Sequence, residues 1–375
     1  MRSSGGAPAP PLGRTTVDSP KARLHEIDLL RILAAVSVMT YHYLFSAYAG
    51  GLSTMQFPHA DIVARYGYLG VDLFFTISGF VVLLSAWDRT PRSFVVSRAV
   101  RLYPAYWMAV TLTTIVSISL SQGRFPVSLP QYLANLTMFN SLPNIENVDV
   151  VYWTLWAEVR FYAMILILTW IGITRRRVTI FLWAWLTATF VFQTGLLPHA
   201  TDLVLNTQFS HYFIAGMALC LIHRYGPTPQ TLLIVAVSLG NAIYRGIGFG
   251  DRVGIRYHTE IHRPAVIAII VVIFAVMLTV ALKWTHRLRR PWFAVLGALT
   301  YPLYLVHAHI GFIIFERLGD QVNHVLLVAA TMLAMVGVAA ALHYGVEQPL
   351  APRLKRLLER VLPGGRRQPV HAVTK

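Results

Sequence analysis

Residues 25–45, HEIDLLRILAAVSVMTYHYLF, decide how the rest of the chain must be arranged. The stretch is apolar enough to enter a bilayer, yet it contains Asp28, Arg31 and His42. At about 100° per residue, Arg31 and His42 lie within about 20° of the same helix face and roughly 16 Å apart along the axis. Asp28 lies within about 40° of His42 on that face. Because ionisable groups cost about 2.5–3.5 kcal/mol each at the centre of a membrane helix, this stripe predicts a functional site.

The composition indicates an integral membrane protein. Hydrophobic residues make up 55% of the 375 residues, charged residues make up 13%, and the mean hydropathy is +0.55. The single cysteine, Cys220, excludes an intramolecular disulfide and a cysteine-based metal cluster. The net charge is +16, but no basic stripe interleaved with aromatic residues lies on a polar domain, so we expect no nucleic-acid partner.

Long apolar segments follow one another almost to the C-terminus, each near the roughly 20 residues that a helix needs to cross a bilayer. We therefore expect an all-α integral membrane protein, a bundle of about ten transmembrane helices. Residues 130–142 are too short to span and predict an interfacial or re-entrant piece. The expected spans are 27–48, 67–87, 102–120, 151–172, 178–196, 203–222, 229–249, 264–284, 292–315 and 322–345.

Lysine and arginine concentrate in alternate loops between these spans, which places both termini in the cytoplasm by the positive-inside rule. The loop 250–263 is an exception, because its arginines and histidines then lie outside, and it could instead belong to an acceptor site. We expect a disordered cytoplasmic tail over 1–24, a transmembrane domain over 25–350 and a basic cytoplasmic tail over 351–375. The sequence LKRLLERVL in that last tail predicts an amphipathic helix at the membrane surface.

Two carboxylates are expected inside the bundle. Asp72, in GYLGVDLFFTISGF, lies in the outer half of the second span, level with His42. Glu158, in YWTLWAEVRFY, lies roughly 9 Å along its helix from Tyr152. Either carboxylate could take part in a site, or could only tie helices together by hydrogen bonds.

Two guanidiniums are expected on adjacent turns of one helix. Arg98 and Arg101, in SRAVRLYP, suit a phosphate or pyrophosphate, which arginine binds in bidentate fashion. They could also be ordinary positive-inside residues, and Arg31 could be a surface anchor or the ion-pair partner of Asp28. In TYPLYLVHAHI, Tyr304 and His307 lie one turn apart and Tyr301 lies a further turn back.

The ordered motifs DLLR-x10-H, GVDLFFTISGF, RAVRLYP, WTLWAEVRFY, YPLYLVH and VEQP resemble the membrane-bound acyltransferase-3 family over roughly residues 25–350. That resemblance implies transfer of acyl groups onto exported or outward-facing glycans, lipids and antibiotics. Two neighbours of the motif residues differ from the family pattern. Leu29 stands where glycine is common, and Thr154 stands where serine is common.

The resemblance also assigns roles to residues of this chain. Arg31 and His42 match the arginine and histidine of the family's first span, and Arg98 and Arg101 match its RxxR pair. It implies acyl-CoA, most simply acetyl-CoA, as a donor whose phosphates bind Arg98 and Arg101 with Arg31 nearby. We expect no metal, since a thioester is already activated.

In this interpretation His42 is the general base that takes the proton of the acceptor hydroxyl. Asp72 or Glu158 would fix the tautomer of His42 and stabilise its imidazolium form. The candidates for binding substrate or donating to the thioester oxyanion are Tyr301, Tyr304 and His307.

We therefore expect a multi-pass O-acyltransferase of the cell membrane, acting on a hydroxyl of a sugar-containing acceptor at the extracytoplasmic face of the lipid bilayer. One alternative is acylation of a small secondary metabolite, such as a macrolide sugar. An alternative from another class is a proton-coupled transporter in which Asp72, Glu158 and His42 form a proton relay.

Overall fold

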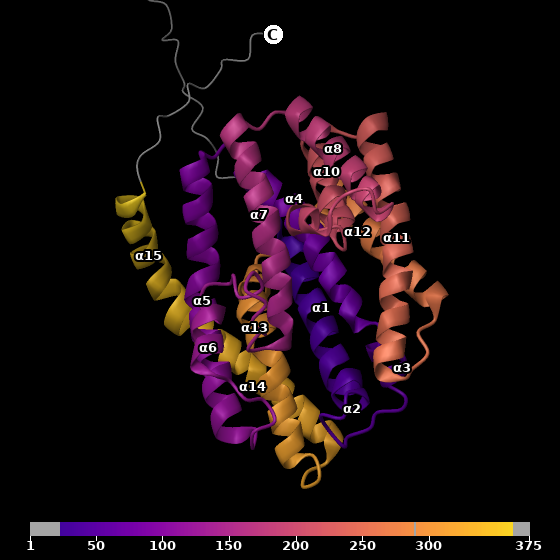
Figure 1. The fold of residues 1–375 in the computed structure, drawn as a ribbon. Helices are drawn as coiled ribbons and strands as arrows, with labels where there is room; N and C mark the ends of the chain where they lie inside the picture. The colour runs from indigo at the N-terminus through magenta and orange to yellow at the C-terminus, as the bar shows by residue number, and fades with distance from the viewer. Residues whose placement is uncertain (1–22, 289, 363–375) are drawn as a thin grey trace, which may run out of the picture.

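The computed structural model describes residues 23–288 and 290–362. These residues form helices joined by loops, and no strand occurs among them (Figure 1). Within the same ranges, eight helical segments are long and apolar enough to cross a membrane. The expected all-α integral membrane protein is confirmed, whereas the number of ten spans and the cytoplasmic termini remain predictions. The expected disordered tail lies almost wholly outside the described residues.

The bundle is built from ten longer helices: α1 (His25–Tyr41), α4 (Gly70–Ala86), α5 (Pro91–Leu120), α7 (Trp153–Ile171), α8 (Arg175–Gln193), α10 (Ser210–Tyr225), α11 (Pro229–Tyr257), α12 (Arg263–Ala281), α13 (Phe293–Leu318) and α14 (His324–Leu342). Shorter helices are α2 (Ala47–Ala49), α3 (Asp61–Ala64), α6 (Leu129–Asn135), α9 (Asp202–Leu205) and α15 (Gln348–Val361). In Figure 1, α1 runs downward toward α2. The end of the bundle near the N-terminus of α1 is called the upper end, and the end near α2 is called the lower end.

Two of the expected spans, now α8 and α10, are not among the eight segments that are long and apolar enough to cross a membrane. α8 begins with three consecutive arginines, and α10 has only 16 residues, which is about 24 Å against a hydrocarbon core of about 30 Å. Both lie in the upper part of the bundle, and the segment between them, with α9, returns part of the way down (Figure 1). The expected span 203–222 is therefore replaced by a helix that starts at Ser210.

Two expected loop segments have a different structure. The expected loop 250–263 is wrong over its first half, because α11 continues to Tyr257 and carries Arg252 and Arg256 on its last turns. The expected surface helix near the C-terminus forms as α15, but it packs against α5, where the guanidinium of Arg92 donates a hydrogen bond to the carbonyl of Glu359. The short piece expected at 130–142 is confirmed as the seven-residue α6.

Small residues allow the central helices to approach closely. At Gly79 of α4, an added Cβ would overlap the backbone carbonyl of Phe213 in α10, and at Gly216 it would overlap that of Thr76. Close packing of this kind is how helices associate in lipid, where apolar surface alone gives little preference for a neighbour. α4 is thereby fixed between α10 and α1, and α1 also packs against α13.

Candidate active site

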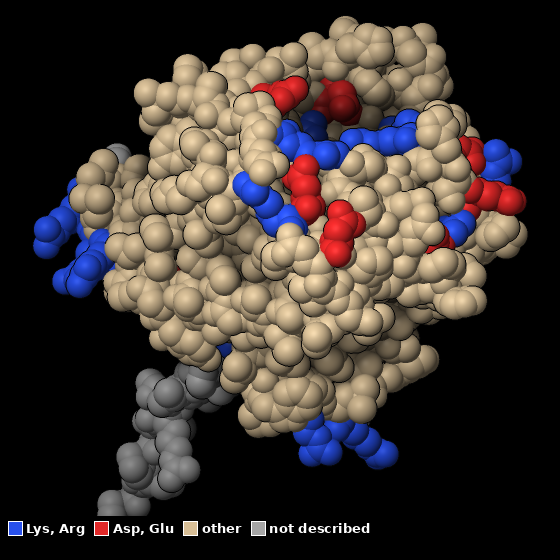
Figure 2. Space-filling model, turned by 90° about the horizontal axis from the view of Figure 1, so that it is seen from below, with Lys and Arg blue, Asp and Glu red and all other residues tan. Residues whose placement is uncertain are grey.

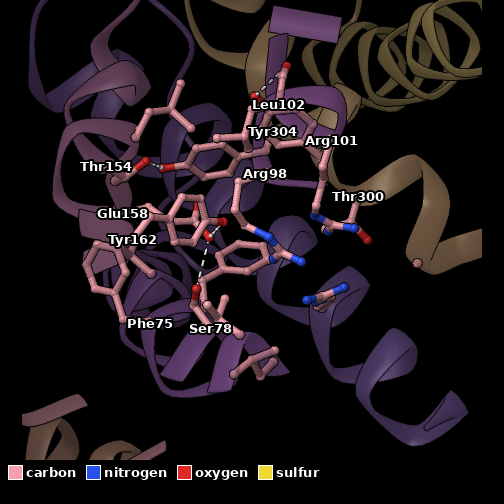
Figure 3. A pocket seen from close by; sticks show the side chains of 18 residues that line it. Phe75, Ser78, Arg98, Arg101, Leu102, Thr154, Glu158, Tyr162, Thr300 and Tyr304 are labelled. Carbon is pink, nitrogen blue, oxygen red and sulfur yellow. Dashed lines mark hydrogen bonds between the residues drawn. The ribbon is translucent and has the colours of Figure 1, made fainter. Parts of the chain in front are cut away.

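A cavity of about 90 Å³ lies between α1, α4, α5, α7 and α13, and we call it the central cavity (Figure 3). Its walls bring together residues that are far apart in the sequence. The predicted site residues that line it are Arg31, Arg98, Arg101, Glu158, Tyr301 and Tyr304. The convergence that the resemblance implied is therefore observed for these six.

The start of α5 positions the two arginines of this helix. The hydroxyl of Thr90 accepts a hydrogen bond from the backbone N–H of Ser93, and Pro91 occupies the first turn, where its missing N–H costs nothing. Arg98 and Arg101 follow two and three turns later, three residues apart, so both reach the same cavity.

Among the described residues, no ion pair within 4 Å joins a guanidinium of the central cavity to a carboxylate, although Glu158 lines the same cavity. Asp28 is bound instead by Arg23, at 2.7 and 3.2 Å, so the ion pair considered between Asp28 and Arg31 is not found. Arg98 donates only to the hydroxyls of Ser85 and Ser97, both at 3.3 Å. This leaves positive charge at the cavity that a bound anion can satisfy.

Glu158 is held by hydroxyl groups. Its carboxylate accepts hydrogen bonds from Ser78 at 2.9 Å and from Tyr162 at 2.5 Å (Figure 3). The ring of Tyr162 also lies 5.6 Å from the guanidinium of Arg98, within range of a cation–π interaction. Glu158 therefore shapes the cavity beside the arginines.

His42 lies at the point where α1 changes its geometry. A π-helical segment, His42–Ser46, continues α1, and the N–H of Ala47 closes it on the carbonyl of His42. π-helical segments are rare in proteins overall, and those that occur are often found at functional sites. The imidazole is buried, with Nδ1 at 3.2 Å from the hydroxyl of Ser46 and its ring 5.2 Å from that of His307.

The expected pairing of His42 with a carboxylate is not found. Asp72 accepts a hydrogen bond from the hydroxyl of Tyr212 at 2.8 Å, and Glu158 is bound as described above. The hydroxyl of Ser46, rather than a carboxylate, lies next to Nδ1 of His42.

His307 connects His42 to the central cavity. Its Nδ1–H donates to the carbonyl of Tyr304 at 2.9 Å, since a carbonyl can only accept, and this leaves a lone pair on the buried Nε2. The rings of His307 and Tyr304 lie 5.6 Å apart, and Tyr304 lines the cavity. Tyr43 fixes this arrangement by donating to the carbonyl of His307 at 2.7 Å.

Two residues of this region were not predicted from the sequence. Asp149 is fully buried beside His307 and accepts hydrogen bonds from the N–H groups of Val151, at 3.1 Å, and His309, at 3.0 Å. It joins the loop before α7 to α13, a contact that no local pattern signals. Ser46 does have a signal, because it lies four residues after His42 on the same helix.

A larger depression of about 830 Å³ lies at the lower end of the bundle, and we call it the lower cavity. It is lined by Phe45 of the π-helical segment after α1, by Tyr48 of α2, by Tyr257 and by charged groups such as the ion pair Arg124–Glu316. Figure 2 shows acidic and basic side chains side by side on this face, among mostly uncharged residues. Aromatic rings with a few charged groups are typical of a site for a polar organic molecule.

No group of three or more His, Cys, Asp or Glu side chains in the described ranges is arranged to hold a metal ion. The arrangement suits chemistry between an anionic molecule in the central cavity and a group that reaches His42.

Comparison with known proteins supports a family assignment. The chain is 32% identical over 99 residues to the peptidoglycan O-acetyltransferase OatA of Listeria monocytogenes, which covers 24% of this chain and 13% of OatA. It is 37% identical over 107 residues to the exopolysaccharide production protein ExoZ of Rhizobium meliloti, covering 26% of this chain and 33% of ExoZ.

A third relative is the putative membrane-bound transacylase BcsY of Komagataeibacter xylinus, 31% identical over 179 residues, which cover 43% of this chain and 42% of BcsY. The matched stretches thus span less than half the length of each relative. No solved structure matches the chain. The family described as "Acyltransferase domain" matches residues 24–344, so this chain is a multi-pass membrane protein that belongs to the acyltransferase-3 family.

Proposed function

We propose that the protein transfers an acyl group, most simply acetyl, from cytoplasmic acyl-CoA to a hydroxyl of a sugar-containing acceptor at the extracytoplasmic face. The observation that carries this proposal is the meeting of three guanidiniums, those of Arg31, Arg98 and Arg101, with the single carboxylate of Glu158 at one cavity of the described chain. This excess of positive charge favours a polyanionic ligand, and the phosphates of CoA have that chemistry.

Arg98 and Arg101 would bind the phosphates at the upper part of the central cavity, and Arg31 would add to the field. Arg101 is exposed and Arg98 is partly buried, so a ligand can reach the first and be oriented by the second. The acyl arm would extend toward Tyr304, whose hydroxyl is hydrogen bonded to that of Thr154 at 3.0 Å. Tyr304 and Tyr301 remain the candidates for contacting the thioester.

His42 would act as the general base. The hydroxyl of Ser46 lies 3.5 Å from the carbonyl of His42, which can only accept, so Ser46 donates there and accepts from Nδ1–H. Nε2 then carries the lone pair that takes the proton of the acceptor hydroxyl. The acceptor oxygen forms a bond to the acyl carbon, the carbon–sulfur bond breaks, and the proton passes from His42 to the leaving thiolate of CoA.

The acceptor would arrive through the lower cavity, since Phe45 and Tyr48 of its wall follow His42 on the same stretch of chain. Relatives with matching segments are named for O-acetylation of peptidoglycan and for exopolysaccharide production. Their names favour a glycan over a small metabolite as the acceptor. A volume of about 830 Å³ has room for one or two sugar units, and ligand sites are typically about 300–1,000 Å³.

The test uses the purified protein in proteoliposomes, with acetyl-CoA on one side and a panel of oligosaccharides on the other. We expect free thiol to appear on the acetyl-CoA side only when an acceptor is present, with one acetyl ester formed per thiol. A proton-coupled transporter predicts a different result, namely substrate flux that follows an imposed pH gradient, without thiol release. That result would contradict the proposed function.

A further inference from the structure

A second polar cavity lies inside the bundle, separate from the central and lower cavities, and we call it the side cavity. It lies between α4, α10 and α11 and is lined by Tyr68, Asp72, Gln208, His211 and Arg245, among others. Its volume of about 40 Å³ exceeds the roughly 10–15 Å³ that a water needs, so it has room for one small charged group.

The side cavity contains buried polar groups without partners. His211 is fully buried, and neither of its ring nitrogens has a hydrogen-bond partner in the described part of the chain. The hydroxyl of Tyr68 is likewise buried and unpartnered. An unpaired buried polar group costs about 1–3 kcal/mol, so two of them in one cavity indicate a ligand that supplies hydrogen bonds.

Positive charge lies at and next to the same cavity, because Arg245 lines it and Arg252 binds Gln208 of its wall. Arg245 and Arg252 lie seven residues apart on α11, within about 20° of one helix face, and both donate to the amide oxygen of Gln208, at 2.7 and 3.3 Å. One neutral oxygen is thus shared by two guanidiniums. Arginine stays charged in proteins, and a neutral amide oxygen does not offset the charge of either guanidinium.

The N-terminus of α10 adds to this positive potential. α10 begins at Ser210, beside His211, and its N-cap residue Phe209 makes no side-chain capping bond. The N–H groups of Ser210 and Tyr212 are bound to the carbonyls of Asn206 and Phe209, so the helix start contributes its partial positive charge rather than free donors.

The carboxylate of Asp72 lines the cavity and accepts a hydrogen bond from the neutral hydroxyl of Tyr212, so an anion would have to bind beside Arg245 rather than beside Asp72. Asp202 accepts hydrogen bonds from Thr207, and Asp251 forms an ion pair with Arg263.

The side cavity lies close to the central cavity and to His42. Val71 lines the side cavity and the central cavity alike. Toward the reaction centre, the ring of Tyr68 lies 5.7 Å from that of Tyr41, and Tyr41 lies 5.2 Å from the ring of His42. A group bound in the side cavity would therefore be held two aromatic rings away from His42.

We infer that Arg245, Arg252, His211 and the start of α10 bind an anionic group of the acceptor, a carboxylate or a phosphate, while its hydroxyl reacts at His42. This inference rests on the proposed function and narrows it to an acidic glycan, such as one containing a uronic acid. The lower cavity shows no such preference, because its acidic and basic groups are mixed.

The experiment compares the binding of methyl glucuronide and methyl glucoside to the purified full-length protein by isothermal titration calorimetry. The glucuronide carries a carboxylate where the glucoside carries a hydroxymethyl group. We expect the glucuronide to bind at least tenfold more tightly, because a hydrogen bond to a charged group contributes enough for that ratio. Arg252→Gln and Arg245→Gln should abolish the preference. Arg252 is exposed, so its variant is expected to fold even where Arg245→Gln does not.

The matched control is Arg256→Gln, which removes an exposed charge from the same helix, one turn from Arg252; in the described chain Gln208 is bound by Arg245 and Arg252 and not by Arg256. It should keep the preference. Equal affinity for the two probes, or a preference that survives Arg252→Gln, would overturn the inference. If phosphatidylglycerol in nanodiscs bound in an Arg252-dependent manner and the glucuronide did not, the site would take a lipid headgroup, and the acceptor assignment would be wrong.

CoA binding, measured on the same samples, separates the two levels of the account. If the wild-type protein binds CoA but does not prefer the glucuronide, only the inference about the side cavity fails. If it binds no CoA, the proposed function fails, whatever the probes show.

Discussion

Replacing Arg98 or Arg101 with glutamine should weaken CoA binding while leaving the fold intact. Each side chain would lose a charge-assisted contact with phosphate, worth about 1.5–3 kcal/mol, and each 1.4 kcal/mol is a factor of ten in affinity. We therefore expect CoA to bind about 10- to 100-fold more weakly to either variant. No ion pair within 4 Å joins either arginine to a carboxylate in the described part of the chain, and Glu158 in the same cavity keeps its hydrogen bonds to Ser78 and Tyr162 after the change.

The assay is calorimetric titration of the purified protein with CoA and, separately, with pantetheine, which lacks the phosphates. The loss should appear with CoA and be absent with pantetheine. Arg92→Gln is the matched control, because Arg92 lies on α5 but binds the carbonyl of Glu359 and does not line the central cavity. Higher salt should weaken CoA binding to the wild-type protein and narrow the difference, since screening shortens from about 10 Å at 0.1 M to about 3 Å at 1 M. Unchanged CoA affinity in both variants would refute the reasoning, and so would an equal loss with pantetheine.

The remaining predictions concern the residues that hold His42 and His307. Gly311→Ala should lower the Tm, because the added Cβ would overlap the ring of Tyr43 at a cost of about 1–3 kcal/mol. Gly337→Ala is the control, since its Cβ would lie in open space and should not lower the Tm. Equal Tm values for the two variants would contradict this reasoning. Asp149→Asn should also lower the Tm, since an amide has one oxygen for two N–H groups, and an unchanged Tm would argue against that role. Ser46→Ala should lower kcat several-fold without changing the KM for acyl-CoA, and Ser46→Thr should restore it; a wild-type kcat in the alanine variant would exclude Ser46 as the partner of His42.

Helical periodicity predicted only part of this meeting. Arg98 and Arg101 lie one turn apart on a long helix, so their spacing puts them on one face. That Arg31 joins them was expected from the resemblance to the family, and so was a place in the site for Glu158, Tyr301 and Tyr304, which stood out as polar groups inside apolar spans.

The partners of the buried polar groups could not be predicted in this way. Asp72 meets Tyr212, and Asp149 meets His309, through contacts between helices distant in sequence, which depend on how tightly α4 approaches α10 and how α13 meets the loop before α7. Hydropathy likewise predicts that a segment enters the membrane, but it does not fix where a helix starts. This is why the span expected at 203–222 begins at Ser210 instead.

The central claim is that His42 is the base for acyl transfer, and the most direct measurement is the rate of CoA release by His42→Ala at saturating acyl-CoA and acceptor. The account predicts a fall of about 10²- to 10⁴-fold with unchanged CoA affinity, because general base catalysis contributes that much. His343→Ala is the control, since His343 pairs with Glu347 at the end of α14 and has no ring contact with His307 in the described chain, whereas the ring of His42 lies 5.2 Å from that of His307; it should release CoA at the wild-type rate. Release by His42→Ala at the wild-type rate would contradict the account.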